Sequence, residues 1–145
     1  MESYISELQI LAMTVFGLMA KALKIDKREM EEMFDDGMQS VRMSYYPPCP
    51  QPEMVTGLRP HSDATCITIL LQVNGGEGFQ IKKDGIWIPV SFLPDAFVVN
   101  VGDTLEVCFP YSLFKIKYFF QITCSDPVKF FKPYQSLSNL FVFLG

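Results

Sequence analysis

The chain has 145 residues, 49% of them hydrophobic, with 12 Lys and Arg against 16 Asp and Glu. This length and composition suit one domain with its own core, and a net charge of −4 without a basic stripe argues against nucleic acid as a partner. The acidic start "MESYISELQI" lacks the basic region of a secretory signal, and no continuous apolar run approaches about 18 residues, so no membrane span is expected.

The cysteines give no sign of a zinc site or a disulfide framework. No two of the four have a C-x-x-C spacing, and no secretory signal precedes them. We therefore expect free thiols in a reducing compartment, the cytoplasm.

A long helix is expected over residues 4–24. Apolar residues recur there at intervals of three and four, which is typical of a helix with one buried stripe. The expected stripe consists of Ile5, Leu8, Leu11, Ala12, Val15, Leu18, Met19 and Ala22.

A second, short helix is expected to begin at Asp26. Glu29 follows three residues later, the spacing of a capping box that satisfies free N–H groups at a helix start. Gly37 is a suitable C-terminal stop. The expected buried face consists of Met30, Met33 and Phe34.

After Gly37 the apolar period changes to two, which indicates a strand. In "SVRMSYYP" (residues 40–47), Ser44 and Tyr46 share one face with Arg42, and Val41, Met43 and Tyr45 share the other. The following "PPCPQP" (residues 47–52) fits neither a helix nor a ladder strand, because four of its six residues lack an N–H.

Further short strands are expected, joined by turns. Asp84-Gly85 is a hairpin signal, because both central residues of a type I′ turn need positive φ. Two helices followed by many short strands predict an α+β chain with a mainly antiparallel sheet, of the jelly-roll kind. The expected strands are 65–73, 79–82, 86–90, 96–101 and 104–107.

The chain changes character at residue 108. Residues 108–145 hold 8 of the 13 phenylalanines and show no sustained strand or helix period. Either this is a poorly patterned buried segment, or it did not evolve with residues 1–107. The second interpretation implies a retained intron, a frameshift or a misplaced exon boundary.

His61 is the single histidine of the chain, and Asp63 follows two residues later in "GLRPHSDATCITILLQ". On a strand, residues i and i+2 point the same way, so the two side chains can converge on one metal. Two histidines and one carboxylate on one face form the site of non-haem iron(II) oxygenases. The H-x-D spacing alone is a weak signal, since a lone histidine is commonly structural.

The neighbouring motifs add a resemblance. "MSYYPPCPQPEMVTGLRPHSDATCITILLQV" and "EGFQIKKDGIWIPVSFLPDAFVVNVGDTLEV" resemble plant iron(II)- and 2-oxoglutarate-dependent dioxygenases, in the group of SRG1-like proteins and alkaloid O-demethylases. The resemblance implies a jelly roll, also called a double-stranded β-helix, that oxidises a small molecule while decarboxylating 2-oxoglutarate. The implied divisions are a helical segment at 1–39, an incomplete jelly roll at 40–107 and an unrelated Phe-rich tail at 108–145.

Four residues fall at functional positions of that family, and three of them match its usual residue. The resemblance implies that His61 and Asp63 are the first two iron ligands and that the Tyr46 hydroxyl contacts 2-oxoglutarate. Ser44 stands where the family usually has Asn. The serine side chain can also donate and accept a hydrogen bond, but it is shorter than that of asparagine.

Two functional residues of the family have no counterpart in the composition. The third ligand is a histidine roughly 50–60 residues after the first, near Lys115 and Lys117 here. The family also clamps 2-oxoglutarate with an Arg-x-Ser pair, and no arginine follows Arg59. The nearby substitute ligands are Cys108, Cys124, Asp103, Glu106 and Asp126.

These observations lead to three functional hypotheses. We favour an inactive remnant of an iron(II)/2-oxoglutarate dioxygenase whose cofactors would be Fe(II) and 2-oxoglutarate. An active oxygenase needs both a substitute ligand and a substitute clamp. An interaction protein would associate with an intact relative through unpaired strand edges.

Overall fold

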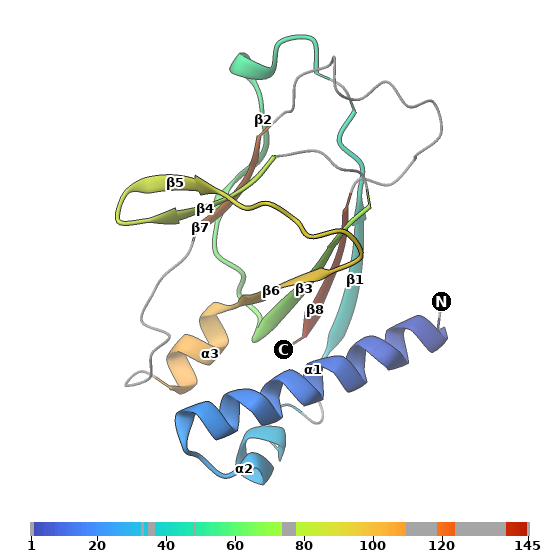
Figure 1. The fold of residues 1–145 in the computed structure, drawn as a ribbon, viewed down its shortest axis with the longest axis vertical. Coiled ribbons are helices and arrows are strands. Elements are labelled where there is room, and N and C mark those ends of the chain that lie inside the picture. The colour runs from blue at the N-terminus through green and yellow to red at the C-terminus, as the bar shows by residue number, and fades with distance from the viewer. Residues whose placement is uncertain are drawn as a thin grey trace.

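A computed structural model describes residues 2–32, 34, 37–47, 49–73, 78–109, 119–123 and 139–144. Two four-stranded sheets pack face to face, and α1 runs beneath one of them (Figure 1). The helices are α1 (Glu2–Leu23), α2 (Lys27–Glu32), the 3₁₀ turn η1 (Pro52–Met54) and α3 (Asp103–Cys108). The strands are β1 (Gln39–Ser44), β2 (Thr56–His61), β3 (Ile67–Gln72), β4 (Phe79–Lys83), β5 (Ile86–Pro89), β6 (Phe97–Val101), β7 (Phe119–Thr123) and β8 (Asn139–Leu144).

The strand order confirms the expected α+β jelly-roll architecture. One sheet has the order β1-β8-β3-β6 and the other has the order β2-β7-β4-β5. Every described pair is antiparallel. Eight strands in two packed sheets are the arrangement of a double-sheet jelly roll.

The last two strands occupy inner positions in the sheets. Val142 of β8 lies opposite Val41 of β1 and opposite Ile69 of β3. In the other sheet, β7 lies between β2 and β4. The sequence pattern predicted neither strand, and the sheets therefore continue past residue 107; the division of the chain at that residue stays a prediction.

The inner face of α1 forms much of the core beneath the first sheet. Leu8, Ala12, Phe16 and Ala20 are buried at intervals of four, and they cluster with Ile67 and Ile69 of β3. Burying a side chain such as Leu8 or Phe16 contributes about 1.5–3 kcal/mol.

The predicted stripe of α1 was wrong at Leu18 and Ala22, which are both exposed. Leu18 is 64% exposed because it lies two residues from Phe16, about 200° around a helix of 3.6 residues per turn. By length and composition α1 is the one helix in the described part of the chain that could cross a membrane, and its inner face is packed in this core.

The second helix begins as the sequence predicted. The Asp26 carboxylate accepts a hydrogen bond of 2.7 Å from the Arg28 backbone N–H. Met30 is fully buried, and the Phe34 ring stacks on Phe16 with 4.7 Å between ring centroids. Met33 lies outside the described residues.

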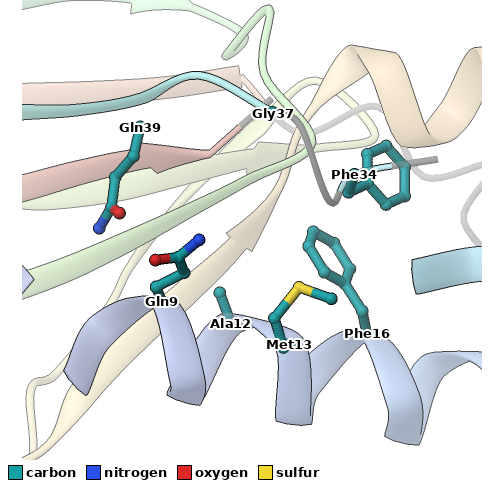
Figure 2. A pocket seen from close by; sticks show the side chains of 7 residues that line it. All are labelled: Gln9, Ala12, Met13, Phe16, Phe34, Gly37 and Gln39. Carbon is teal, nitrogen blue, oxygen red and sulfur yellow. The ribbon is translucent and has the colours of Figure 1, made fainter. Parts of the chain in front are cut away.

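A small pocket separates α1 from the segment that leads into β1 (Figure 2). Its volume is about 20 Å³, enough for one water molecule and far too small for an organic cofactor. Its lining consists of Gln9, Ala12, Met13, Phe16, Phe34, Gly37 and Gln39. It is therefore a packing defect of the helix–sheet interface.

The hairpin between β4 and β5 is confirmed. Asp84 and Gly85 have φ angles of 51° and 83°, the positive values that a type I′ turn requires. Lys83 and Ile86 are paired on either side of this two-residue turn.

The strand predicted over residues 104–107 was wrong, because these residues belong to helix α3. Only Leu105 of the helix is buried, whereas Val107 is 76% exposed. Asp103 and Glu106 lie in the first turn, where the helix dipole favours negative charge. The apolar residues alternate with a period of two over only four residues. This pattern is too short to predict a strand against the acidic residues that favour a helix start.

The sequence pattern did not predict β2, apart from the strand position expected for His61. Pro60 lies within this strand and cannot donate a ladder hydrogen bond. The structure accommodates it because β2 is at the edge of its sheet and its register with β7 shifts between Leu58 and His61.

The inner position of β8 can be tested with proline. Val142→Pro removes the backbone N–H of a residue paired on both sides, and we expect it to lower the free energy of unfolding by about 3 kcal/mol or more. Val142→Ala keeps that N–H and is the control. Urea unfolding followed by circular dichroism measures both, and equal stabilities of the two variants would contradict the placement of β8.

Candidate metal site

His61 ends β2, and Asp63 lies two residues beyond it in a loop rather than on the strand that the H-x-D argument assumed, yet the two side chains are close together. His61 Nε2 lies 3.5 Å from Asp63 Oδ1. The His61 side chain is 38% exposed and the Asp63 side chain 8%, so the pair opens to solvent through the imidazole. Metal–nitrogen and metal–oxygen bonds of about 2.1 Å would let both atoms reach one ion, since their separation is less than twice that length.

The ring orientation of His61 suits this role. His61 Nδ1 lies 2.8 Å from the Arg59 carbonyl oxygen, which can only accept a hydrogen bond. In the neutral imidazole the proton is therefore on Nδ1, and the lone pair of Nε2 faces Asp63. A carbonyl partner that fixes the tautomer in this way is a regular feature of metal-binding histidines.

The Asp63 carboxylate is held through its other oxygen. Thr68 Oγ1 donates a hydrogen bond of 2.7 Å to Asp63 Oδ2, and the Thr68 side chain is fully buried on β3. Sequence analysis missed Thr68. The available signal was a hydroxyl inside the apolar run "ITILLQ", since a buried polar group needs a partner.

The loop that carries Asp63 is fastened to the segment between β6 and α3. The Asp103 backbone N–H donates to the Asp63 carbonyl at 2.8 Å, and the Gly102 N–H donates to the Cys66 carbonyl at 2.8 Å. Thr104 Oγ1 also donates to the Ala64 carbonyl at 2.8 Å. These three bonds tie the loop of residues 62–66 to a segment that is distant in the sequence.

Gly102 is required by the closeness of that contact. A Cβ at this position would lie 1.9 Å from the Thr65 carbonyl oxygen and 2.9 Å from the Asp63 carbonyl oxygen. Both atoms belong to the backbone, so no side chain can move aside.

The residues fit two ligands of an iron site but not three. Within the described ranges, no group of three His, Cys, Asp or Glu side chains could hold a metal. Phe120 of β7 lies opposite His61 in the register, and the β7 sequence "FFQIT" holds no ligating residue. The window around Lys115 and Lys117, where the resemblance places the third ligand, lies outside the described residues.

The suggested substitute ligands do not complete the site in the described part of the chain. Asp103 Oδ2 accepts a hydrogen bond of 2.7 Å from Ser62 Oγ. Glu106 and Cys108 lie on α3, with Cys108 exposed at its end. Cys124 and Asp126 lie outside the described residues.

Ser44 ends β1, and Tyr46, two residues beyond the strand, forms a side-chain hydrogen bond with it. Burial raises the pKa of the Tyr46 hydroxyl, while the nearby Arg42 charge and a side-chain hydrogen bond with Ser44 lower it. Tyr46 packs against the apolar cluster of Leu70 and Phe79 between the two sheets.

Cys66, at the end of the fastened loop, is an inert thiol. Its side chain is fully buried, and this burial, together with the neighbouring Cys108, raises its pKa to about 11 from an ordinary value of 9.0. A thiol with this pKa is protonated near neutral pH and is a poor metal ligand.

A family model, the 2OG-Fe(II) oxygenase superfamily, matches residues 37–114. The oxoglutarate-dependent flavonoid 7-O-demethylase 1 of Ocimum basilicum is 58% identical over 106 residues, which cover 73% of this chain and 28% of that protein. Thebaine 6-O-demethylase of Papaver somniferum is 56% identical over 109 residues, which cover 73% of this chain and 30% of that enzyme. This chain thus spans less than a third of the length of these relatives.

Solved structures share the fold over nearly the whole chain. A crystal structure of JOX2 in complex with 2OG, Fe and JA superposes with a TM-score of 0.82 at 29% identity, covering 97% of this chain and 40% of that one. The dioxygenase for auxin oxidation 1 from Arabidopsis thaliana, in its complex with 2-oxoglutarate, superposes with a TM-score of 0.79 at 19% identity. The match covers 98% of this chain and 50% of that one, a likeness of fold alone.

The Gly102 contact predicts a severe effect of a single methyl group. Gly102→Ala should lower the free energy of unfolding by about 3 kcal/mol or more, because the loop of Asp63 must move away from the backbone of residue 102. Chemical denaturation measures the change.

Gly17→Ala is the matched control for Gly102→Ala. Its Cβ would meet only the flexible end of the Lys27 side chain, and Ala is better than Gly by about 1 kcal/mol inside a helix. We expect this variant to be as stable as the parent or slightly more so. A Gly102→Ala protein of parental stability would overturn the proposed close contact.

Proposed function

The chain belongs to the 2OG-Fe(II) oxygenase superfamily, and from that premise we propose that these 145 residues form a non-catalytic fragment of such an enzyme. The carrying observation is the convergence of His61 and Asp63 without a third ligand among the described residues. The sequence adds that no second histidine is present anywhere in the chain. A two-ligand site binds iron more weakly and leaves its coordination incomplete.

Each inherited residue keeps a role in this proposal. His61 Nε2 and Asp63 Oδ1 would hold Fe(II), which would supply oxygen activation where a complete ligand set surrounded it. By resemblance to the family, the Tyr46 and Ser44 hydroxyls would contact 2-oxoglutarate. The bidentate carboxylate clamp is missing, because Arg59 is the last arginine of the sequence. 2-Oxoglutarate should therefore bind poorly even where the two hydroxyls are in place.

The proposed chemistry of intact relatives is oxidation of a small plant metabolite, in keeping with the demethylases that the chain resembles. We place the chain in the cytoplasm, without nucleic acid or membrane as partners. The free thiols of Cys49, Cys66 and Cys108 suit a reducing compartment. The proposed residue 107 boundary makes 108–145 a segment of separate origin, and sequencing the transcript across codons 107 and 108 tests this origin.

A second candidate function is association with an intact relative or a second copy. β5 and β6 are at the ends of their sheets, and both carry exposed apolar side chains. These side chains are Ile86 and Ile88 on β5, and Phe97 and Val99 on β6. Edge strands of this kind are templates for further strand pairing. Size-exclusion chromatography with a full-length relative distinguishes a defined complex from aggregation.

Anaerobic Fe(II) and 2-oxoglutarate binding, followed by succinate release in air, tests the proposed inactivity. We expect weak Fe(II) binding that His61→Ala abolishes, and no succinate above a protein-free control, because the ligand set and the clamp are incomplete. A full-length relative is the positive control. Succinate release at the rate of that relative would exclude the non-catalytic proposal.

The missing ligand also predicts a gain of binding. Phe120→His adds a histidine at the position opposite His61 in the β2–β7 register. We expect Fe(II) or Co(II) affinity to rise by at least about tenfold, because a third side chain joins the ligand set. Isothermal titration under nitrogen measures it.

Ile122→His is the matched control, because residue 122 is on the same strand opposite Leu58. This variant should leave the metal affinity unchanged. Equal affinities in both histidine variants would refute the view that position 120 faces a metal half-site.

A further inference from the structure

We infer that Thr68 is a positioning residue for the metal half-site formed by His61 and Asp63. Thr68 holds the Asp63 carboxylate so that one oxygen accepts its hydrogen bond and the other faces His61. This inference rests on the proposed function, because it takes His61 and Asp63 as metal ligands. The Thr68 side chain contacts the proposed ligand Asp63 but would not contact the metal itself.

The first support is the geometry at the carboxylate. Asp63 Oδ2 accepts the Thr68 Oγ1 hydrogen bond at 2.7 Å, and Oδ1 lies 3.5 Å from His61 Nε2. With one oxygen engaged, rotation of the carboxylate would break a short hydrogen bond in a buried place. Oδ1 therefore stays directed at the nitrogen with which it would share an ion.

The second support is the rigidity of Thr68 itself. Thr68 lies in the middle of its sheet, paired with Asn100 of β6 on one side and Phe143 of β8 on the other. Its side chain is fully buried, and its β-branched rotamer is restricted. Thr65 Oγ1 lies 3.4 Å from Thr68 Oγ1. The Thr65 hydroxyl can thus donate to Thr68 while Thr68 donates to Asp63.

The third support is that the backbone of Asp63 is fixed independently of its side chain. The Asp103 N–H holds the Asp63 carbonyl, and the Gly102 N–H holds the Cys66 carbonyl. Because these backbone bonds do not involve Thr68, its hydroxyl contributes to the position of the carboxylate rather than to that of the loop backbone. Partners that orient a metal ligand in this way typically change metal affinity by about 10- to 100-fold when removed.

The test is Mn(II) binding by the full 145-residue chain. Binding is measured as the loss of the six-line electron paramagnetic resonance signal of free Mn(II). Thr68→Val keeps the shape of the side chain and removes the hydroxyl, and it should weaken Mn(II) binding by about 10- to 100-fold. Thr68→Ser keeps a hydroxyl and should restore binding to within about threefold of the parent. Thr68→Ala replaces Thr68→Val if the valine variant does not fold.

Thr104→Val is the matched control. It removes a hydrogen bond of 2.8 Å to the Ala64 carbonyl in the same loop without touching the Asp63 carboxylate. Thermal unfolding of each metal-free variant separates loss of fold from loss of binding. We expect Thr104→Val to lose some stability and to keep the parental Mn(II) affinity.

The outcomes separate this inference from the proposed function. Parental Mn(II) binding by Thr68→Val, or an equal loss in Thr104→Val, overturns the positioning role and leaves the half-site standing. Absence of Mn(II) binding in the parent chain overturns the positioning role together with the metal half-site, and leaves the non-catalytic proposal standing. A loss confined to Thr68→Val and Thr68→Ala, with recovery in Thr68→Ser, establishes the role.

Discussion

The pairing of the two last strands with the earlier ones is the constraint on which both functional segments depend. Among the described strands, β1 joins its sheet only through β8, and β2 joins its sheet only through β7. β1 ends at Ser44 and β2 ends at His61, so the segments that carry the proposed cofactor and metal residues are both placed by strands from late in the chain. A single ladder hydrogen bond contributes only about 0.5–1.5 kcal/mol net, but an edge strand that loses its one partner loses all of them together.

A second constraint acts on Asp63 alone. Strand β2 stops at His61, and the loop beyond it has no sheet partner of its own among the described strands. The backbone of residues 102–104 takes that place, and Gly102 allows an approach that any Cβ would prevent. The half-site is thus built from one ligand at a strand end and one in a loop, each fixed by a different distant segment.

The sequence predicted those features that depend on neighbours in the chain. The positive-φ pair Asp84-Gly85 and the cap at Asp26 are local, and the structure shows both of them. His61 and Asp63 lie close together although Asp63 is beyond the strand, and a distant segment holds the Asp63 loop. Helix α3 was mistaken for a strand because a two-residue alternation carries little information over so short a segment. β7 and β8 could not be predicted, because their register is set by partners up to about 100 residues away rather than by an internal period. The bond from Thr68 to Asp63 depends on the same long-range placement of β3 against the loop.

The parts of the half-site differ in how strongly the fold itself requires them. Gly102 and Thr68 are buried, and replacing either disturbs backbone packing or leaves a buried carboxylate oxygen without its donor. Such changes cost stability whether or not a metal binds, since an unsatisfied buried polar group costs about 1–3 kcal/mol. His61 is different, because its side chain is 38% exposed and its described contacts are the Arg59 carbonyl and Asp63 itself. A fold that no longer needed iron would still require Thr68, Asp63 and Gly102 for its packing, whereas the exposed His61 side chain contributes little to that packing.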